Sequence, residues 1–213
     1  MHLVLHSAWR ATGPYRVRIG LALKGLAYDY VPVDLVAGQQ HSEAFRAVNP
    51  LGLLPALVVD GRVMTQSLSI LEWLEETAPT PAILPRDPAD RALVRALADI
   101  VACEIHPLNV PRVAKVLADL GVTEADRLGW LRHWMIEGFQ VLEPMIARHG
   151  AGFAFGDTPT LADCCLIPQV YSARRYGVDL TPFPAIVAVD RQAAGHPAFA
   201  AAHPDRQPDA IPV

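Results

Sequence analysis

Cysteine is scarce in this sequence and is not arranged for cross-linking. The 213 residues include three cysteines, Cys103 and the adjacent Cys164 and Cys165. A disulfide framework or a zinc site needs more cysteines at characteristic spacings, so we expect neither disulfides nor a bound metal. All three lie in apolar patterns with helical spacing, which predicts buried free thiols. Free thiols are typical of a reducing compartment, and we expect the protein to be cytoplasmic.

Long apolar runs and an excess of one charge are also missing. No stretch approaches the roughly 20 apolar residues that a membrane-spanning helix needs, and no basic leader followed by an apolar segment is visible at the start. The net charge is -4 and the 18 Lys and Arg are spread along the chain, which argues against a nucleic-acid partner. Hydrophobic residues make up 52% of the chain and charged residues 19%, as in a globular protein with a buried core.

The first fifty residues alternate between strand and helix patterns. Residues 3–5 form a short apolar run, and residues 28–33 read as a second strand. Between them, after a loop that extends to Tyr15, residues 16–24 have the spacing of a helix. Ser42 is suited to cap a short helix after the second strand. This order predicts a βαβ unit.

The stretch from Asn49 to Glu76 contains the strongest local signals. An apolar run over residues 53–59 leads to Asp60-Gly61, a tight-turn dipeptide, and to further apolar residues, which predicts a β-hairpin. A helix-spaced apolar set follows at residues 70–74, with Ser67 or Ser69 available as its N-cap. The first N–H groups of such a helix lack intrahelical partners and favour an anion.

Proline marks a change of character at residues 78–88, which hold four of the 19 prolines and read as a linker. Beyond it strand patterns nearly vanish, and helical spacing covers residues 89–118 with breaks at His106-Pro107 and Pro111, then 130–149 and 160–171. Thr160 and Asp163 have the spacing of a reciprocal N-terminal cap. The pattern therefore predicts a small α/β domain followed by an all-helical one.

Several stretches together resemble one family, the zeta-class glutathione transferases, which include maleylacetoacetate isomerase and the bacterial maleylpyruvate isomerases. They are WRATGPYRVRIGL, KGLAYDYVPVDL, NPLGLLPAL, QSLSILEWLEE and FGDTPTLADC. The resemblance implies a glutathione transferase fold, with a thioredoxin-like α/β domain over residues 1–79 that binds glutathione and an all-α substrate domain over residues 85–213. It also implies glutathione as cofactor and a homodimer.

The sulfur-binding signature departs from the family pattern, usually written W/F-R-S-S-C-x-x-R-V-R-I-A-L. Its first serine, the hydroxyl usually assigned to the glutathione sulfur, falls at Ala11, its second at Thr12 and its cysteine at Gly13. Alanine has no side-chain donor. Two alternatives remain open: Thr12 takes over as the catalytic hydroxyl, or backbone N–H groups near Gly13 hold the thiolate.

The remaining site residues follow the family more regularly. The resemblance implies that Gln40 contacts the glycyl end of glutathione, that Leu54 pairs its backbone with the cysteinyl part ahead of a cis Pro55, and that Gln66 and Ser67 hold the γ-glutamyl carboxylate. His106 matches a position that relatives place near glutathione, although a residue at a helix kink before Pro107 is an equally good interpretation of it.

Three arginines match substrate-binding positions of the maleylpyruvate isomerase branch: Arg10 beside the sulfur loop, also a catalytic candidate, Arg112 and Arg175. Guanidinium groups bind carboxylates with two parallel hydrogen bonds, and maleylpyruvate and maleylacetoacetate each carry two carboxylates. The resemblance thus implies glutathione-dependent cis–trans isomerisation of a maleyl keto acid. Two other functions stay open: a transferase or dehalogenase acting on small α-halo acids, and a weakly catalytic glutathione-binding protein.

Overall fold

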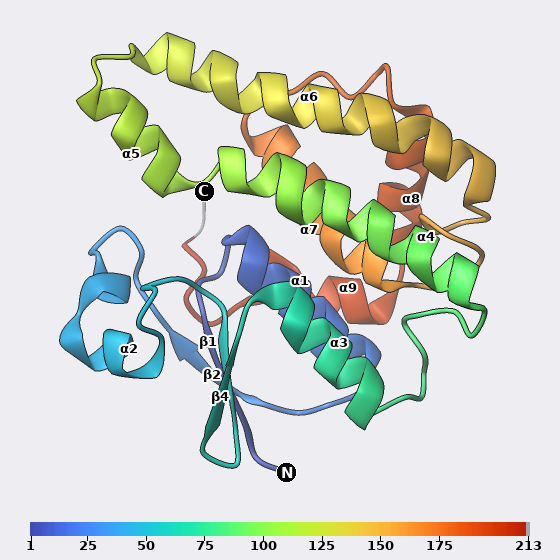
Figure 1. Ribbon diagram of the computed structural model, residues 1–213, viewed down its shortest axis with the longest axis horizontal. Helices are drawn as coiled ribbons and strands as arrows, with labels where there is room; N and C mark the ends of the chain where they lie inside the picture. The colour runs from blue at the N-terminus through green and yellow to red at the C-terminus, as the bar shows by residue number, and fades with distance from the viewer. Residues whose placement is uncertain (212–213) are drawn as a thin grey trace. The chain divides into compact units, whose positions relative to one another are not determined.

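The computed structural model describes residues 1–211, and the chain divides into two compact units. The first contains Met1–Ile83 together with the chain from Gly195 onward, and the second contains Leu84–Ala194. Figure 1 follows the chain from blue to red. The helical domain expected over residues 85–213 differs from this division at its end, because the segment after residue 194 packs with the first unit. Residues 212 and 213 of that expected domain lie outside the described residues.

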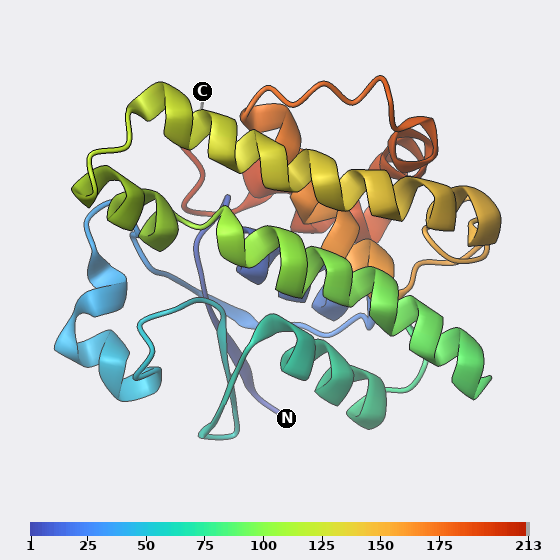
Figure 2. The same cartoon turned by 45° about the horizontal axis from the view of Figure 1, so that its top comes forward.

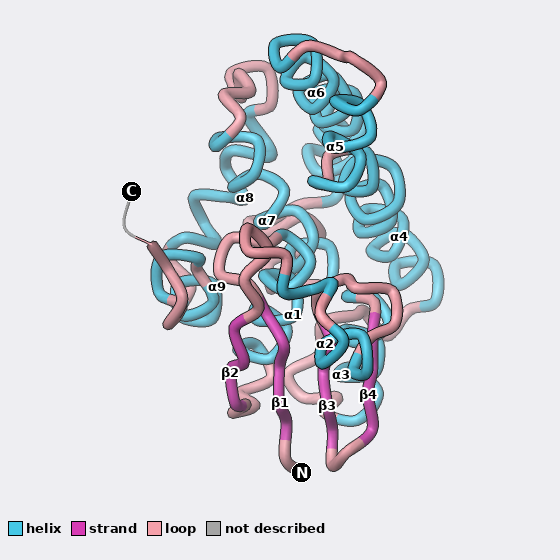
Figure 3. The backbone as a smooth tube through the Cα atoms, turned by 90° about the vertical axis from the view of Figure 1, so that its left-hand side faces the viewer, coloured by secondary structure: helices cyan, strands magenta, loops and turns pink. Residues whose placement is uncertain are grey.

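Four strands form the sheet of the first unit in the order β2-β1-β3-β4 (Figure 3). They are β1 (Leu3–Ser7), β2 (Asp29–Pro32), β3 (Ala56–Val59) and β4 (Arg62–Thr65). β1 is parallel to β2 and antiparallel to β3, and β3 and β4 form the predicted hairpin. Asp60 and Gly61 make its turn with φ angles of 47° and 85°. The thioredoxin-like arrangement that the resemblance implied is confirmed.

Helix α1 packs against two other helices of the same unit. It spans Thr12–Leu23 and contacts both α3 (Ser67–Thr77) and α9 (Pro197–Ala202). A Cβ atom at Gly20 would lie 2.3 Å from Leu71 Cδ2, so glycine is what allows α1 and α3 to approach this closely. Helix α9 continues into a short 3₁₀ turn, η4 (Pro204–Arg206). The C-terminal segment is thereby a structural part of the first unit.

The start of α1 corrects the sequence prediction. The loop was expected to extend to Tyr15, whereas the helix begins at Thr12. Pro14 is then the third helical residue, where a missing N–H removes no intrahelical hydrogen bond. Gly13-Pro14 therefore lies in the first turn of the helix and not in the loop before it.

A short connection joins β2 to the hairpin. It contains η1 (Gln39–His41), a 3₁₀ turn, and α2 (Glu43–Val48). Ser42 is the N-cap of α2, because its Oγ accepts a hydrogen bond of 3.2 Å from the Phe45 N–H, as predicted.

The second unit is built from helices. They are α4 (Pro88–Asp99), α5 (Pro111–Asp119), α6 (Glu124–His149), α7 (Leu161–Arg175) and α8 (Pro184–Ala194), with a π-helical segment η2 (Ile100–Ile105) and a 3₁₀ turn η3 (His106–Leu108) after α4. Figure 2 shows α6 running alongside α4 and its continuation. The predicted breaks at His106-Pro107 and Pro111 are where η3 and α5 begin. Among residues 1–211 no helix is long and apolar enough to span a membrane.

The predicted cap of α7 is present. The Thr160 N–H donates to Asp163 Oδ2 over 2.7 Å, the Thr160 hydroxyl donates to the same oxygen over 2.9 Å, and the Ala154 N–H donates to Oδ1 over 2.7 Å. The carboxyl is fully buried, and burial raises its pKa from 3.8 to about 6. Asp163 therefore joins the start of α7 to the turn that precedes it.

The cysteines need one correction. Cys164 and Cys165 are buried and form no disulfide within residues 1–211, as predicted, but Cys103 is exposed. Its burial was predicted from the 3.6-residue period of an α-helix. Cys103 lies in η2, which is π-helical, so its side chain does not fall on the face that this period predicts.

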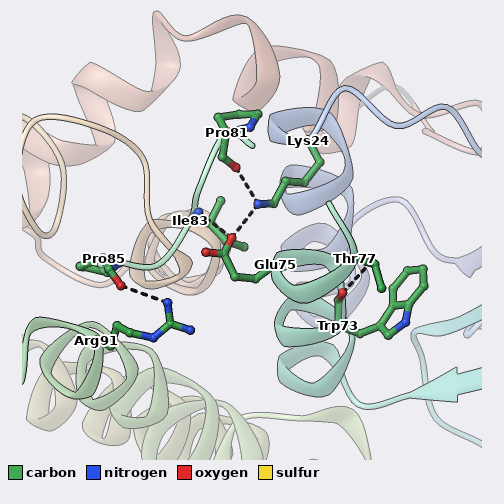
Figure 4. Close-up of polar contacts among 8 residues, drawn as sticks. All are labelled: Lys24, Trp73, Glu75, Thr77, Pro81, Ile83, Pro85 and Arg91. Carbon is green, nitrogen blue, oxygen red and sulfur yellow. Dashed lines mark hydrogen bonds and ion pairs between the residues drawn. The ribbon is translucent and has the colours of Figure 1, made fainter. Parts of the chain in front are cut away.

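A buried ion pair joins α1, α3 and the end of the first unit (Figure 4). Lys24 Nζ lies 2.6 Å from Glu75 Oε2 and 2.6 Å from the Pro81 carbonyl oxygen. Glu75 Oε2 also accepts the Ile83 N–H over 2.9 Å. Because both charged groups are almost inaccessible to water, each depends on the other for its stability.

Candidate glutathione site in the first unit

The first turn of α1 offers hydrogen-bond donors without side-chain caps. Ala11 occupies the N-cap position, with φ and ψ of -75° and 128°, and makes no side-chain cap. Thr12 and Gly13 are the first two helical residues, whose N–H groups have no acceptor within the helix. The half-buried Thr12 hydroxyl lies in the same turn. This end of the helix carries a partial positive charge and is suited to stabilise a thiolate.

The structure brings this turn against Leu54 and Pro55. A Cβ atom at Gly13 would lie 3.1 Å from the Leu54 carbonyl oxygen and 3.2 Å from Pro55 Cδ, which leaves little room for a side chain. The Leu54–Pro55 peptide bond is cis, as the resemblance implied. The residue expected to pair with the cysteinyl backbone and the turn expected to hold its sulfur are therefore neighbours.

Asn49 shapes the loop that leads to Leu54. Its side chain is buried, and Nδ2 donates to the Leu53 carbonyl over 2.7 Å while Oδ1 accepts the Leu51 N–H over 3.2 Å. Gly52, with φ of 63°, completes this loop: a Cβ atom there would lie 2.9 Å from the Gln40 carbonyl oxygen. The loop before Leu54 and the η1 turn are thus packed against each other.

Gln40 itself retains unused hydrogen-bonding capacity. It is the central residue of η1, and its side-chain oxygen is buried without a hydrogen-bond partner among residues 1–211. A buried amide oxygen without a partner is costly, so a ligand that donated to it would stabilise the site. This fits the predicted role of Gln40 in holding one end of a peptide ligand.

Gln66 and Ser67 open helix α3, with a correction to the predicted cap. Neither Ser67 nor Ser69 is the N-cap; Gln66 takes that position with φ of 67° and ψ of 118°, a conformation rare for a residue other than glycine. Ser67 is the first helical residue and is buried. Gln66 makes no side-chain cap, so the first N–H groups of α3 have no cap acceptor from it.

Arg16 lies behind this helix start. The residue is 2% exposed, and one terminal guanidinium nitrogen donates to Ser67 Oγ over 3.3 Å. An arginine has no acceptor, so the Ser67 oxygen must accept this bond and its hydroxyl hydrogen is free to point elsewhere. A buried cation, a serine hydroxyl and a helix N-terminus together form a site suited to a carboxylate.

The arginines proposed to bind substrate are all exposed. Arg10 stacks over the ring of Trp9, with 5.0 Å from its guanidinium carbon to the ring centroid. In the second unit Arg112 is the second residue of α5. Arg175 ends α7 and stacks on Tyr176 at 4.6 Å, whereas its neighbour Arg174 is bound to Asp190 at 2.7 Å. Arg175 is therefore better placed than Arg174 to receive a carboxylate.

His106 is the first residue of η3, where the helical winding that runs through α4 and η2 changes to a 3₁₀ turn. The geometry of a kink residue is thus present, and the role in glutathione binding stays a prediction. Among residues 1–211 no group of three or more His, Cys, Asp or Glu side chains is placed to hold a metal ion.

Comparison with known proteins places the chain in a family. The glutathione S-transferase N-terminal domain matches residues 14–77, and the glutathione S-transferase C-terminal domain matches residues 111–202. The maleylacetoacetate isomerase of Rhizobium meliloti (strain 1021) is 49% identical over 205 residues, covering 95% of this chain and 96% of that protein. The chain belongs to the zeta-class glutathione transferases.

Two solved structures and a further relative are similar to this glutathione transferase over nearly their whole length. A maleylpyruvate isomerase from a Ralstonia species is 47% identical over 209 residues, 96% of this chain and 98% of that one. The holo structure of a maleylpyruvate isomerase, described as a bacterial zeta-class enzyme, superposes with a TM-score of 0.96 at 46% identity, covering 98% of this chain and 100% of that one. A maleylacetoacetate isomerase from Anaeromyxobacter dehalogenans 2CP-1, solved with glutathione in its active site, has a TM-score of 0.90 at 46% identity, covering 99% and 98%.

Two buried polar residues beside the candidate site were missed from the sequence. Arg16 and Asn49 are buried polar residues whose partners lie 51 and up to four positions away. The partners of Asn49 lie within four residues of it, and an Asn before a Pro favours a turn, so the sequence could have predicted this loop. Arg16 had a weaker signal, since it belongs to a helix start rich in apolar residues where an arginine needs a specific reason to be buried.

Proposed function

We propose that this protein catalyses glutathione-dependent cis–trans isomerisation of a maleyl keto acid, either maleylacetoacetate or maleylpyruvate. The observation that carries the proposal is the packing of Gly13, in the first turn of α1, against the cis Leu54–Pro55 peptide. It puts a helix N-terminus next to the backbone expected to align a cysteinyl residue. Relatives 47–49% identical over nearly the whole chain are named for this chemistry.

The residues present fit glutathione. Ser67 and the N–H groups at the start of α3, with Arg16 behind them, suit its γ-glutamyl carboxylate. Leu54 offers backbone groups to the cysteinyl part, and Gln40 offers its unpaired side chain to the glycyl end. These assignments rest on three features of the first unit: the buried Gln40 side-chain oxygen without a partner, the buried cation of Arg16, and the close packing of Gly13 against Leu54.

Bound glutathione supplies the sulfur nucleophile that adds to the conjugated cis double bond and leaves again after rotation. The chain's own task is to keep that sulfur ionised, which the Thr12 hydroxyl or the N–H groups of Thr12 and Gly13 perform by donating hydrogen bonds. Arg10, which precedes the first turn of α1, is proposed to bind a substrate carboxylate and to stabilise the negative charge that develops on the keto acid. Arg112 and Arg175, in the second unit, stay candidates for substrate carboxylates on the strength of the resemblance.

The decisive experiment measures loss of the cis absorbance of maleylpyruvate and of maleylacetoacetate, each with and without glutathione. Isomerisation only with glutathione supports the proposal, and the faster acid identifies the substrate. Halide release from dichloroacetate without isomerisation would instead support the dehalogenase alternative. Tight glutathione binding with an unchanged thiol pKa and no turnover would indicate a binding protein, the alternative that Ala11 favours.

The setting of this activity is also part of the proposal. We place the enzyme in the cytoplasm, in the breakdown of aromatic compounds, as a homodimer. The cysteines are few and form no disulfide among residues 1–211, which supports a reducing compartment. Sedimentation of the purified protein would test the dimer.

A further inference from the structure

Arg18 is buried in the first unit and binds the loop that precedes α1. Its guanidinium donates to the Ser7 Oγ at 3.1 Å, the Ala8 carbonyl at 3.3 Å, the Trp9 carbonyl at 2.7 Å and the Ala202 carbonyl at 3.1 Å. Its side chain is 0% exposed. One side chain thus joins the end of β1, the sulfur loop and the C-terminal segment.

Asp209 holds the same loop from its other side. Its carboxylate accepts the Trp9 N–H over 3.0 Å and the Tyr30 hydroxyl over 2.6 Å. Trp9 therefore has its carbonyl bound by Arg18 and its N–H bound by Asp209. Two hundred residues separate Trp9 from Asp209, so this contact exists only because the chain from Gly195 onward returns to the first unit.

The charges of Arg18 and Asp209 oppose movement of the loop that contains Trp9. Burial lowers the pKa of Arg18, and the nearby Asp209 opposes that shift. Burial and the hydrogen bond to Asp209 raise the pKa of Tyr30, so its hydroxyl stays protonated and donates. A buried cation that lost one of its acceptors would be left partly unsolvated, which penalises any displacement of the loop.

The loop leads directly to the groups that would hold the sulfur. The Ala11 N–H donates to the Ala8 carbonyl over 3.1 Å, the same carbonyl that Arg18 binds, and α1 starts at Thr12. Placement of the loop therefore sets the position of the Thr12 hydroxyl and of the first helical N–H groups. Displacing such donors by about 1 Å is enough to cost on the order of 100-fold in rate.

We propose that Arg18 and Asp209 are positioning residues of the glutathione site, and that the C-terminal segment, through Asp209, fixes the sulfur-binding turn. The inference rests on the proposed glutathione-dependent activity, because it concerns how the thiol is activated. Neither residue touches the reacting atoms; both act through the backbone of Trp9.

The test compares Asp209→Ala with two matched variants. Tyr30→Phe removes the tyrosine contact to Asp209 but leaves the bond to the Trp9 N–H. Asp205→Ala removes an exposed carboxylate four residues earlier, whose ion pair is with His203. For each variant we would measure kcat, glutathione affinity, the pKa of the bound thiol from thiolate absorbance, thermal stability, and amide exchange of the peptide that covers residues 9–13.

We expect Asp209→Ala to lower kcat by about 10- to 100-fold, to raise the pKa of the bound thiol toward that of free glutathione, and to speed amide exchange in the loop. Glutathione affinity should change little, and Asp205→Ala should match wild type throughout. Arg18→Lys, which keeps the charge but cannot reach four acceptors, should behave like Asp209→Ala if it folds.

The proposal is overturned if Asp209→Ala keeps the wild-type kcat and thiol pKa, whether or not its stability falls. It is also overturned if Tyr30→Phe impairs catalysis as strongly while the loop exchanges normally. If the wild-type protein bound glutathione without lowering the pKa of its thiol, the proposed function itself would be contradicted. Measuring the wild-type protein first therefore distinguishes that failure from failure of the positioning proposal.

Discussion

Replacing Thr12 by valine tests whether a side chain or the helix backbone activates the thiol. Valine keeps the size and β-branching of threonine and removes only the hydroxyl. That hydroxyl makes no hydrogen bond to residues 1–211, so its loss should change the stability of the fold by less than about 0.5 kcal/mol. A hydrogen bond to a thiolate contributes about 1.5–3 kcal/mol, which corresponds to roughly 10- to 150-fold in rate.

We therefore expect Thr12→Val to lower kcat for the maleyl acid by that factor, with a higher pKa of the bound thiol and nearly unchanged glutathione affinity. Thr12→Ser, which restores the hydroxyl, is the control and should retain most of the activity. Stopped-flow absorbance of the cis acid measures turnover, and thiolate absorbance of the enzyme–glutathione complex measures ionisation. Wild-type turnover in Thr12→Val would remove the hydroxyl from the mechanism and assign the task to the N–H groups of Thr12 and Gly13.

Three further predictions concern buried charges. Arg16→Met should weaken glutathione binding by about 10-fold or more, since a hydrogen bond involving a charged group is lost. A glutathione analogue that lacks the γ-glutamyl carboxylate should bind the wild-type protein and the variant equally well. If the variant instead bound glutathione and the analogue with equally weakened affinity, Arg16 would only maintain the fold. For Asp163 the folded pKa of about 6 lies above the unfolded 3.8, so the native state binds the extra proton and stability from this group falls as pH rises through that range. The free energy of unfolding of wild type relative to Asp163→Asn should thus drop by up to about 3 kcal/mol between about pH 4 and 7; a flat difference in denaturant titrations would refute it. Lys24→Met should cost about 3–5 kcal/mol by leaving Glu75 buried without its cation, and a second change, Glu75→Gln, should recover part of that loss in the same titrations.

Local patterns were enough for most of the fold. The Asp60-Gly61 turn, the Ser42 cap and the Thr160–Asp163 cap each depend on residues within a few positions, and all were predicted. The start of α1 was misplaced because Gly13-Pro14 was interpreted as a loop signal, although proline is equally suited to a first helical turn. The cap of α3 was missed because a glutamine with positive φ has no local signature.

The site was less accessible to sequence reasoning, since it depends on long-range contacts. Leu54 and Gly13 meet only because β3 and the start of α1 lie together in the folded sheet and helix layers. The cis Leu54–Pro55 bond came from family resemblance, as local sequence alone favours trans. Asp209 lies in a segment that was assigned to the other domain, and its contact with Trp9 could not be found from spacing.

Ala11 and Pro14 together point to a mechanism that depends on the helix backbone, and Ala11→Ser is the variant that probes it. A serine at this N-cap could accept only from the Gly13 N–H within the first turn, because Pro14 has no N–H to offer. Serine should therefore stabilise the protein by about 0.5–2 kcal/mol, seen as a higher melting temperature. The same bond would occupy the Gly13 donor, so we expect the added hydroxyl to bring no gain in kcat. A clear rise in turnover would mean that a hydroxyl at position 11 activates the sulfur better than the free N–H groups, and that the present residue weakens catalysis.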